Sequence, residues 1–303
     1  MTRTDVEWSA EGVTLRGWFY TPADASGPLA CVVLQHGFSG VKEMRLDAYA
    51  TVIAEAGLAC LVYDHPGFGA SDAVPGTPRG EIDPWQQIRY IQHAITYAQS
   101  RPEVDPDGIG LWGSSYGAAH TYVTAAIDRR VKAAVGQVPL ISGSQAFASL
   151  IRIDQWANIE AMFAADRLSR LGGAEPMMVP VVDPDPTVPA ALRTADAYEW
   201  VTRMQKEEAP DWRNEITLRS LEMLRGYEPG LYLPLVSPTP LLMVVAPHDR
   251  LVAGEWACAA YERAVHPKKL VLIPGGHFDV YDGQPFELSS QAARDWFAEH
   301  LLR

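Results

Sequence analysis

The sequence predicts an α/β fold built on a mostly parallel sheet with helices on both faces. Short apolar runs typical of buried strands alternate with stretches whose apolar residues recur at helical spacing, over residues 30–138 and again over 241–301. Such alternation indicates repeated strand–helix–strand units, whose strands lie parallel because each helix crosses back over the sheet. Hydrophobic residues make up 48% of the 303 residues and charged residues 20%, which favours a large core over disorder.

The first predicted elements form a hairpin, with strands at residues 6–8 and 14–20 and a turn at Glu11 and Gly12. Asp83 followed by Pro84 is typical of a helix start, because an acidic cap then precedes proline at the first helical position. The predicted buried strands cover residues 30–34, 58–63, 109–112, 131–138, 241–246 and 270–273. The predicted helices cover residues 46–56, 84–98, 116–126, 255–264 and 288–301.

The alternation breaks between residues 140 and 240. Residues 179–189 are rich in proline and predict a loop, whereas the flanks at 144–171 and 193–226 look helical. The flanks carry several large aromatic residues, namely Trp156, Phe163, Tyr198, Trp200 and Trp212. We therefore predict an α/β core at residues 1–139 and 241–303, interrupted by an insertion at 140–240 that is not a separate folding unit.

Composition excludes several classes of function. A formal net charge of −12 repels phosphate backbones and anionic lipid surfaces, so neither nucleic acid nor membrane is expected as a partner. No apolar run approaches the roughly 20 residues of a membrane span, and residues 1–5 do not resemble a secretory signal. Cys31, Cys60 and Cys258 lack the spacing of a disulfide framework or a zinc site, so we expect reduced thiols, a cytoplasmic location and no metal or other cofactor. Oligomeric state is left open, and a homodimer is compatible with the sequence.

A candidate nucleophile lies in the segment Gly113-Ser114-Ser115-Tyr116-Gly117, which matches the pattern G-x-S-x-G. The pattern occurs by chance in many proteins, but here it follows a predicted strand and opens a predicted helix. A serine at that position lies on a sharp turn, at a helix N-terminus whose free N–H groups favour negative charge. We predict Ser115 as the nucleophile and Ser114 as a packing neighbour; the alternative is an ordinary strand–helix turn.

A serine hydroxyl needs a base, and His277 is the candidate. In folds with this serine pattern, the chain order is serine, acid, histidine, which leaves His248, His266, His277 and His300. Of these, His277 follows the last predicted strand directly, and α/β sheets place their sites in loops at the carboxyl ends of strands. The alternative is a structural histidine.

The acid is expected after the preceding strand, where Asp249 follows residues 241–246. It would orient the imidazole and stabilise its protonated form. The alternative is a surface carboxylate paired with Arg250. Asp279 is a weaker candidate, because a residue only two positions from His277 is poorly placed to reach its ring.

The loop after the first buried strand, residues 35–40, is a candidate for one half of an oxyanion hole. The backbone N–H groups of Phe38 and Tyr116 would hold the negative oxygen, and Gly37 would allow a close approach of the backbone. The alternative is a glycine turn that serves only the chain path. We interpret residues 64–69 as a structural turn in which Asp64 binds backbone N–H groups.

Taken together, these residues resemble the α/β-hydrolase superfamily over nearly the whole chain. The segments HGFSGVKEM, YDHPGFGASD, GSSYGAAH, WRNEITLRSLEM and YEPGLYLPLVSPTPLLMVVAPHDRLV are similar to a branch that includes fungal polyketide transferases and bacterial dienelactone-hydrolase-like proteins. True dienelactone hydrolases use a cysteine nucleophile, and haloalkane dehalogenases and epoxide hydrolases an aspartate, where this chain has Ser115. The resemblance implies an acyl-enzyme on Ser115 and a lid formed by residues 140–240.

The expected function is hydrolysis of an ester, thioester or lactone of a mainly apolar acyl substrate, a small molecule. Transfer of the same acyl group to an alcohol or amine is the nearest alternative, because both reactions share the acyl-enzyme. A binding protein without catalysis on the same fold is a third reading, since fold does not imply function. The presence of serine, acid and histidine in the required order favours an enzyme.

Overall fold

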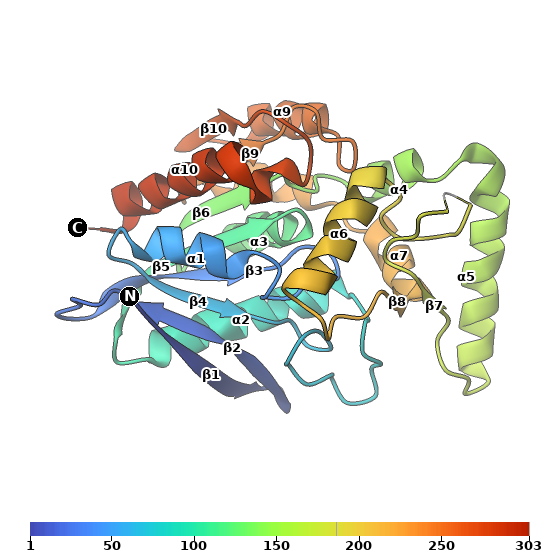
Figure 1. The fold of residues 1–303 in the computed structure, drawn as a ribbon, viewed down its shortest axis with the longest axis horizontal. Coiled ribbons are helices and arrows are strands. Elements are labelled where there is room, and N and C mark those ends of the chain that lie inside the picture. Colours follow the sequence, from blue (N-terminus) through green and yellow to red (C-terminus); the bar gives the residue numbers. More distant parts are fainter. Residues whose placement is uncertain (186, 303) are drawn as a thin grey trace.

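The computed structural model describes residues 1–185 and 187–302, and within them eight strands form a single large sheet (Figure 1). Their order across the sheet is β1-β2-β4-β3-β5-β6-β9-β10. The strands are β1 (Thr2–Ala10), β2 (Val13–Thr21), β3 (Leu29–Gln35), β4 (Ala59–Tyr63), β5 (Val104–Ser114), β6 (Val131–Gln137), β9 (Leu241–Val245) and β10 (Lys268–Leu272). β1 pairs antiparallel with β2, and β2 pairs antiparallel with β4. The other six strands, β4, β3, β5, β6, β9 and β10, run parallel to one another, which confirms the predicted, mostly parallel sheet.

Helices cover both faces of the sheet, and the core accordingly forms two clusters. The covering helices are α1 (Leu46–Ala54), α2 (Pro84–Ser100), α3 (Tyr116–Ile127), α9 (Gly254–Arg263) and α10 (Gly283–Leu301). α1 packs against α10 on one face, and α2 packs against α3 on the other (Figure 1). Alternate residues of β3 point to opposite faces, so Val32 and Leu34 join the first cluster and Cys31 and Val33 join the second.

Two local predictions are confirmed in detail. Glu11 and Gly12 both adopt positive φ, as expected for a tight turn whose twist matches that of the flanking strands β1 and β2. The Asp83 carboxylate accepts hydrogen bonds from the N–H groups of Trp85 and Gln86, which otherwise have no partner at the start of α2.

Residues 140–240 leave the sheet after β6 and return at β9, its direct neighbour. They contain α4 (Gly143–Leu150), α5 (Trp156–Leu171), α6 (Ala195–Glu207), α7 (Leu218–Arg225), α8 (Leu233–Val236), β7 (Met178–Val179), β8 (Ile216–Thr217) and the 3₁₀ turns Ile153–Gln155 and Pro229–Tyr232. α4, α5 and α7 gather at one end of the molecule (Figure 1). Phe147, Phe163 and Val201 belong to the same hydrophobic cluster as Val32 of the sheet.

Several predicted boundaries were wrong. The helical flanks are interrupted, at residues 151–155 between α4 and α5 and at 208–217 between α6 and α7. Val179 lies in a strand rather than a loop, because this β-branched residue is buried and pairs with Ile216. β5 extends well beyond the predicted 109–112, since its pairing with β3 continues across a bulge past the turn-like residues at 105–108.

The remaining composition-based expectations concern thiols, metals and membranes. Cys31, Cys60 and Cys258 are free thiols, and burial raises the pKa of Cys31 to about 12. Across residues 1–185 and 187–302, no group of three or more histidine, cysteine, aspartate or glutamate side chains is arranged to hold a metal ion. Over the same residues, no helix combines the length and apolar character that crossing a membrane requires.

A buried ion pair joins the loops that follow β3 and β4. Lys42 Nζ lies 2.7 Å from Asp64 Oδ2, and both side chains are almost fully buried. The Asp64 carboxylate also accepts from the N–H groups of Lys42 (2.8 Å) and Ala70 (3.0 Å). This confirms the predicted role of Asp64 in binding backbone N–H groups. Lys42 was not predicted as its partner, because the two residues are 22 positions apart in the chain.

We expect Lys42→Met to lower the free energy of unfolding by about 3–5 kcal/mol, because it leaves the Asp64 charge buried without its partner. Lys269→Met, at an exposed position of β10, is the matched control and should change stability by no more than about 0.5 kcal/mol. Urea unfolding of both variants measures the difference. Equal decreases in the free energy of unfolding in the two variants would show that the buried pair stabilises the fold no more than a surface lysine does.

Candidate active site

Ser115 lies at the sharp turn between β5 and α3, with φ 57° and ψ −115°. This conformation is rare for a residue with a side chain, and the surrounding hydrogen bonds maintain it. The Ser115 N–H donates to the Gln137 carbonyl (2.8 Å), and the Ser115 carbonyl accepts from the N–H groups of Ala118 (3.1 Å) and Leu140 (3.2 Å). The strained turn therefore is tied to both β6 and the segment that follows it.

The two glycines of the motif are required by close backbone contacts. A Cβ added to Gly113 would lie 2.2 Å from the Gly117 carbonyl oxygen, and one added to Gly117 would lie 2.6 Å from that of His36. Such distances are far below contact between real atoms, so neither position accepts a side chain. Strand β5 and helix α3 therefore nearly touch at the motif, and Gly117 in addition touches the end of β3.

The structure brings Ser115, His277 and Asp249 together as a continuous chain of hydrogen bonds. Ser115 Oγ lies 3.0 Å from His277 Nε2, and His277 Nδ1 lies 2.6 Å from Asp249 Oδ2. Because the carboxylate can only accept, Nδ1 carries the ring proton and Nε2 is left as an acceptor for the serine hydroxyl. The three residues come from loops after β5, β9 and β10, as the sequence predicted.

Asp249 is buried, which distinguishes it from the surface carboxylate considered as the alternative. Its Oδ1 accepts from the N–H groups of Leu251 (2.8 Å) and Val252 (3.0 Å). Burial opposes ionisation, but the His277 ring and these two donors outweigh it and lower the pKa of Asp249 below its ordinary value. Asp279, in contrast, binds the Gly276 N–H and orders the loop that carries His277.

The loop after β3 places Phe38 beside Ser115, since both line the same small cavity. His36 Nε2 accepts from the His65 N–H (3.1 Å), so its Nδ1 carries the proton and donates to the Gly37 carbonyl (2.9 Å). The carbonyl and N–H of one trans peptide point in opposite directions, so the Phe38 N–H points away from the His36 ring. Tyr116 is the first residue of α3, where an N–H has no acceptor within its helix.

The cavity at Ser115 has a volume of only about 50 Å³. One wall comes from the predicted insertion, through Leu192, Trp200 and Val201. The Trp200 ring stacks on Phe278 at 5.1 Å and lies 4.8 Å from the Tyr281 ring, centroid to centroid. Helix α6 therefore packs directly over the loop that carries His277 and shields it from solvent.

Two contributors to this site were missed from the sequence. Ser114, expected to be a packing neighbour, shares a 2.5 Å hydrogen bond with the Tyr281 hydroxyl and so links β5 to the turn after His277. Trp200 was noted only as one aromatic residue of the insertion. Neither role has a local signal, because each depends on residues more than 70 positions away in the chain.

Comparisons with known proteins identify the family of this chain. The family described as serine aminopeptidase S33 matches residues 26–281, most of the chain. The chain belongs to this α/β-hydrolase family. Polyketide transferase GrgF of Penicillium sp. is similar to this α/β hydrolase, with 33% identity over 92% of this chain and 90% of its own length. A thiohydrolase of Eupenicillium brefeldianum is 29% identical over 95% and 92% of the two chains.

Solved structures agree with these sequence relatives. The structure of DcsB in complex with its substrate analogue is 30% identical to this α/β hydrolase and superposes with a TM-score of 0.86 over 100% of both chains. The fold class and the resemblance to the polyketide-transferase branch are therefore confirmed. The chain is an enzyme of the α/β-hydrolase type.

We expect Asp249→Asn to change how stability depends on pH. A carboxylate whose pKa is lowered on folding stabilises the protein above its unfolded pKa of about 3.8, and this contribution is lost as pH falls through the lower folded value. The stability advantage of wild type over the variant should therefore be full at neutral pH and shrink below about pH 4. Urea unfolding across this range measures it, with exposed Asp24→Asn as control. An advantage that is constant with pH would contradict the assigned ionisation.

Proposed function

We propose that this α/β hydrolase cleaves an ester, thioester or lactone of a mainly apolar acyl substrate through an acyl-enzyme on Ser115. The observation that carries the proposal is the buried chain of contacts from Ser115 Oγ to His277 to Asp249. Nucleophilic acyl chemistry needs three groups: an ionised carboxylate, an imidazole with an acceptor nitrogen, and a hydroxyl close to that nitrogen. Here the hydroxyl of Ser115 lies 3.0 Å from His277 Nε2.

In the first half of the reaction, Ser115 Oγ attacks the substrate carbonyl carbon and its proton passes to His277 Nε2. Asp249 stabilises the resulting imidazolium and keeps its proton on Nδ1. The tetrahedral intermediate collapses, the bond from carbon to the leaving oxygen or sulfur breaks, and that atom takes the proton from Nε2. The acyl group is then bonded to Ser115.

In the second half, water attacks the acyl carbon and gives a proton to His277 Nε2. Collapse of the second intermediate releases the carboxylic acid, and Ser115 Oγ recovers its proton from the same nitrogen. In both halves we assign the oxyanion to the N–H groups of Phe38 and Tyr116. The orientation of the Gly37–Phe38 peptide and the position of Tyr116 at the helix start support this assignment.

Residues 140–240 would act as the lid over this site. Support comes from α6, whose residues wall the cavity and whose Trp200 shields the His277 loop. The lining is dominated by aromatic and aliphatic side chains, which favours an apolar acyl group over a charged one. Relatives named polyketide transferase and thiohydrolase point in the same direction.

We expect Ser115→Ala to lower kcat/KM for p-nitrophenyl acetate by about 10⁴–10⁶-fold, because the nucleophile is removed. A fluorophosphonate probe should label wild type and leave this variant unlabelled. Ser100→Ala is the matched control and should retain labelling, since Ser100 is an exposed serine outside the cavity. Equal hydrolysis by wild type and Ser115→Ala would end the proposal.

Asp249→Asn should lower kcat by about 10⁴-fold at neutral pH, because an amide cannot stabilise the imidazolium or hold the required tautomer. The measurement is steady-state hydrolysis of p-nitrophenyl acetate, with the folded state checked by circular dichroism. A loss of less than tenfold in a folded variant would show that His277 does not depend on this carboxylate.

Acyl transfer to an alcohol or amine is the second candidate, and two observations favour it. Relatives such as GrgF are named polyketide transferases, and the cavity at Ser115 is small and covered by Trp200, which limits water at the acyl-enzyme. Adding alcohols or amines during p-nitrophenyl ester turnover and measuring the ratio of new ester or amide to free acid separates the two. Product that remains entirely free acid at saturating acceptor would exclude transfer to the acceptors tested.

A further inference from the structure

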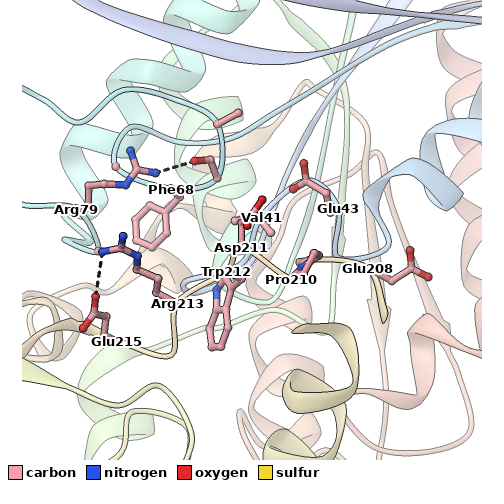
Figure 2. Close-up of a pocket in the computed structure, with 15 residues that line it drawn as sticks. Val41, Glu43, Phe68, Arg79, Glu208, Pro210, Asp211, Trp212, Arg213 and Glu215 are labelled. Carbon is pink, nitrogen blue, oxygen red and sulfur yellow. Dashed lines mark hydrogen bonds and ion pairs between the residues drawn. The ribbon is translucent and has the colours of Figure 1, made fainter. Parts of the chain in front are cut away.

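Trp212 lies between two cavities. Its side chain lines the inner cavity at Ser115 and also lines an outer pocket of about 380 Å³ between residues 67–80 and the loop 208–215. Figure 2 shows Trp212 at the base of this outer pocket, with Phe68, Arg79 and Arg213 to one side and Glu43 and Glu208 to the other. Trp212 is thus the residue that the linings of the two cavities share.

The volumes show that the inner cavity alone cannot hold a substrate. About 50 Å³ is only about three to five times the roughly 10–15 Å³ that one water molecule needs. Ligand sites usually measure about 300–1,000 Å³, a range that includes the outer pocket. The acyl group takes part in both halves of the proposed reaction and is bonded to Ser115 between them, whereas the leaving group departs in the first half. The acyl chain therefore needs space at the site for longer than the leaving group does.

The indole of Trp212 is held by one hydrogen bond and lies on a loop. Its Nε1 donates to the Ser39 carbonyl (2.7 Å), in the same loop as Phe38. The residue belongs to the loop between α6 and α7, where its own N–H binds the Ala209 carbonyl (3.0 Å). The indole is buried within the same hydrophobic cluster as Val201, so turning it aside breaks the bond to Ser39 and gives up part of this packing.

The lining of the outer pocket restricts the chemistry of its ligand. Apolar contact surface comes from Val41, Phe68, Pro210 and Trp212. Four carboxylates, those of Glu43, Glu208, Asp211 and Glu215, face two guanidinium groups, those of Arg79 and Arg213. Arg79 already donates to the Ser71 and Gly69 carbonyls, and Arg213 lies 3.7 Å from Glu215. Glu43 is paired with Lys42 at 2.6 Å, so Glu208 and Asp211 are the carboxylates that would repel an anionic chain and accept hydrogen bonds from hydroxyl groups.

We propose that the outer pocket binds the far part of the acyl chain, a neutral chain of medium length that bears hydroxyl groups. Trp212 is the side chain that turns aside to connect this pocket with Ser115. The inference rests on the proposed acyl-enzyme function and deepens it, since it assigns a subsite and a class of acyl group.

The test compares kcat/KM for p-nitrophenyl octanoate and acetate, because only the longer chain reaches past Trp212. Ala70→Trp places an indole in the outer pocket from an exposed position and should lower the octanoate-to-acetate ratio about tenfold or more. Trp212→Ala joins the two cavities and should raise the ratio by a similar factor. Trp85→Ala, at a half-exposed tryptophan that lines neither cavity, is the matched control and should leave the ratio unchanged.

An unchanged ratio in both Ala70→Trp and Trp212→Ala, with acetate still hydrolysed, would overturn the subsite and leave the proposed function standing. Failure of the proposed function has a different signature, because wild type would then hydrolyse no ester faster than Ser115→Ala. If Trp212→Ala does not fold, Ala70→Trp decides alone.

The chemical class is tested with the p-nitrophenyl esters of 8-hydroxyoctanoic acid and of octanedioic acid, which end in a hydroxyl and a carboxylate. Wild type should prefer the hydroxyl ester about tenfold or more, and Asp211→Asn with Glu208→Gln should narrow that preference. Equal kcat/KM for both esters in wild type would overturn the assignment of a neutral chain.

Discussion

The site depends on one constraint, the strained turn at Ser115. A positive φ at a residue with a side chain persists only where the surrounding structure holds it. Here hydrogen bonds from the Ser115 backbone to the Gln137 carbonyl and to the N–H groups of Ala118 and Leu140 hold this conformation. The turn raises the hydroxyl clear of the sheet. It also brings α3 so close to β5 that Gly113 and Gly117 accept no side chain.

The parallel sheet supplies the remaining groups, because its strands end at a common edge. The loops after β3, β5, β9 and β10 contribute Phe38, Ser115, Asp249 and His277, which are distant in sequence and adjacent in space. The insertion then covers this edge, with Trp200 packed against Phe278. The strands position the candidate reacting groups, while the insertion, as the proposed lid, would determine which molecules reach them.

The sequence was informative wherever the constraint is local. Three features could be predicted because each depends on the backbone of a single segment. They are the small residues around Ser115, the cap at Asp83, and the strand ends before Asp249 and His277. Sequence reasoning failed where partners are distant, as for Lys42 with Asp64. Sequence reasoning also failed in the insertion, because packing rather than periodicity decides there where a helix stops. Likewise, Val179 forms a short strand because of its distant partner Ile216.

The loop after β3 links catalysis to substrate choice. At one end the His36 ring holds the Gly37 carbonyl and thereby sets the direction of the Phe38 N–H. Two residues beyond Gly37, the Ser39 carbonyl accepts the indole N–H of Trp212. A chain that displaces the indole therefore removes a hydrogen bond from the same loop that would stabilise the oxyanion. In the proposed mechanism, substrate length and transition-state stabilisation would therefore be coupled through three consecutive residues, 37–39.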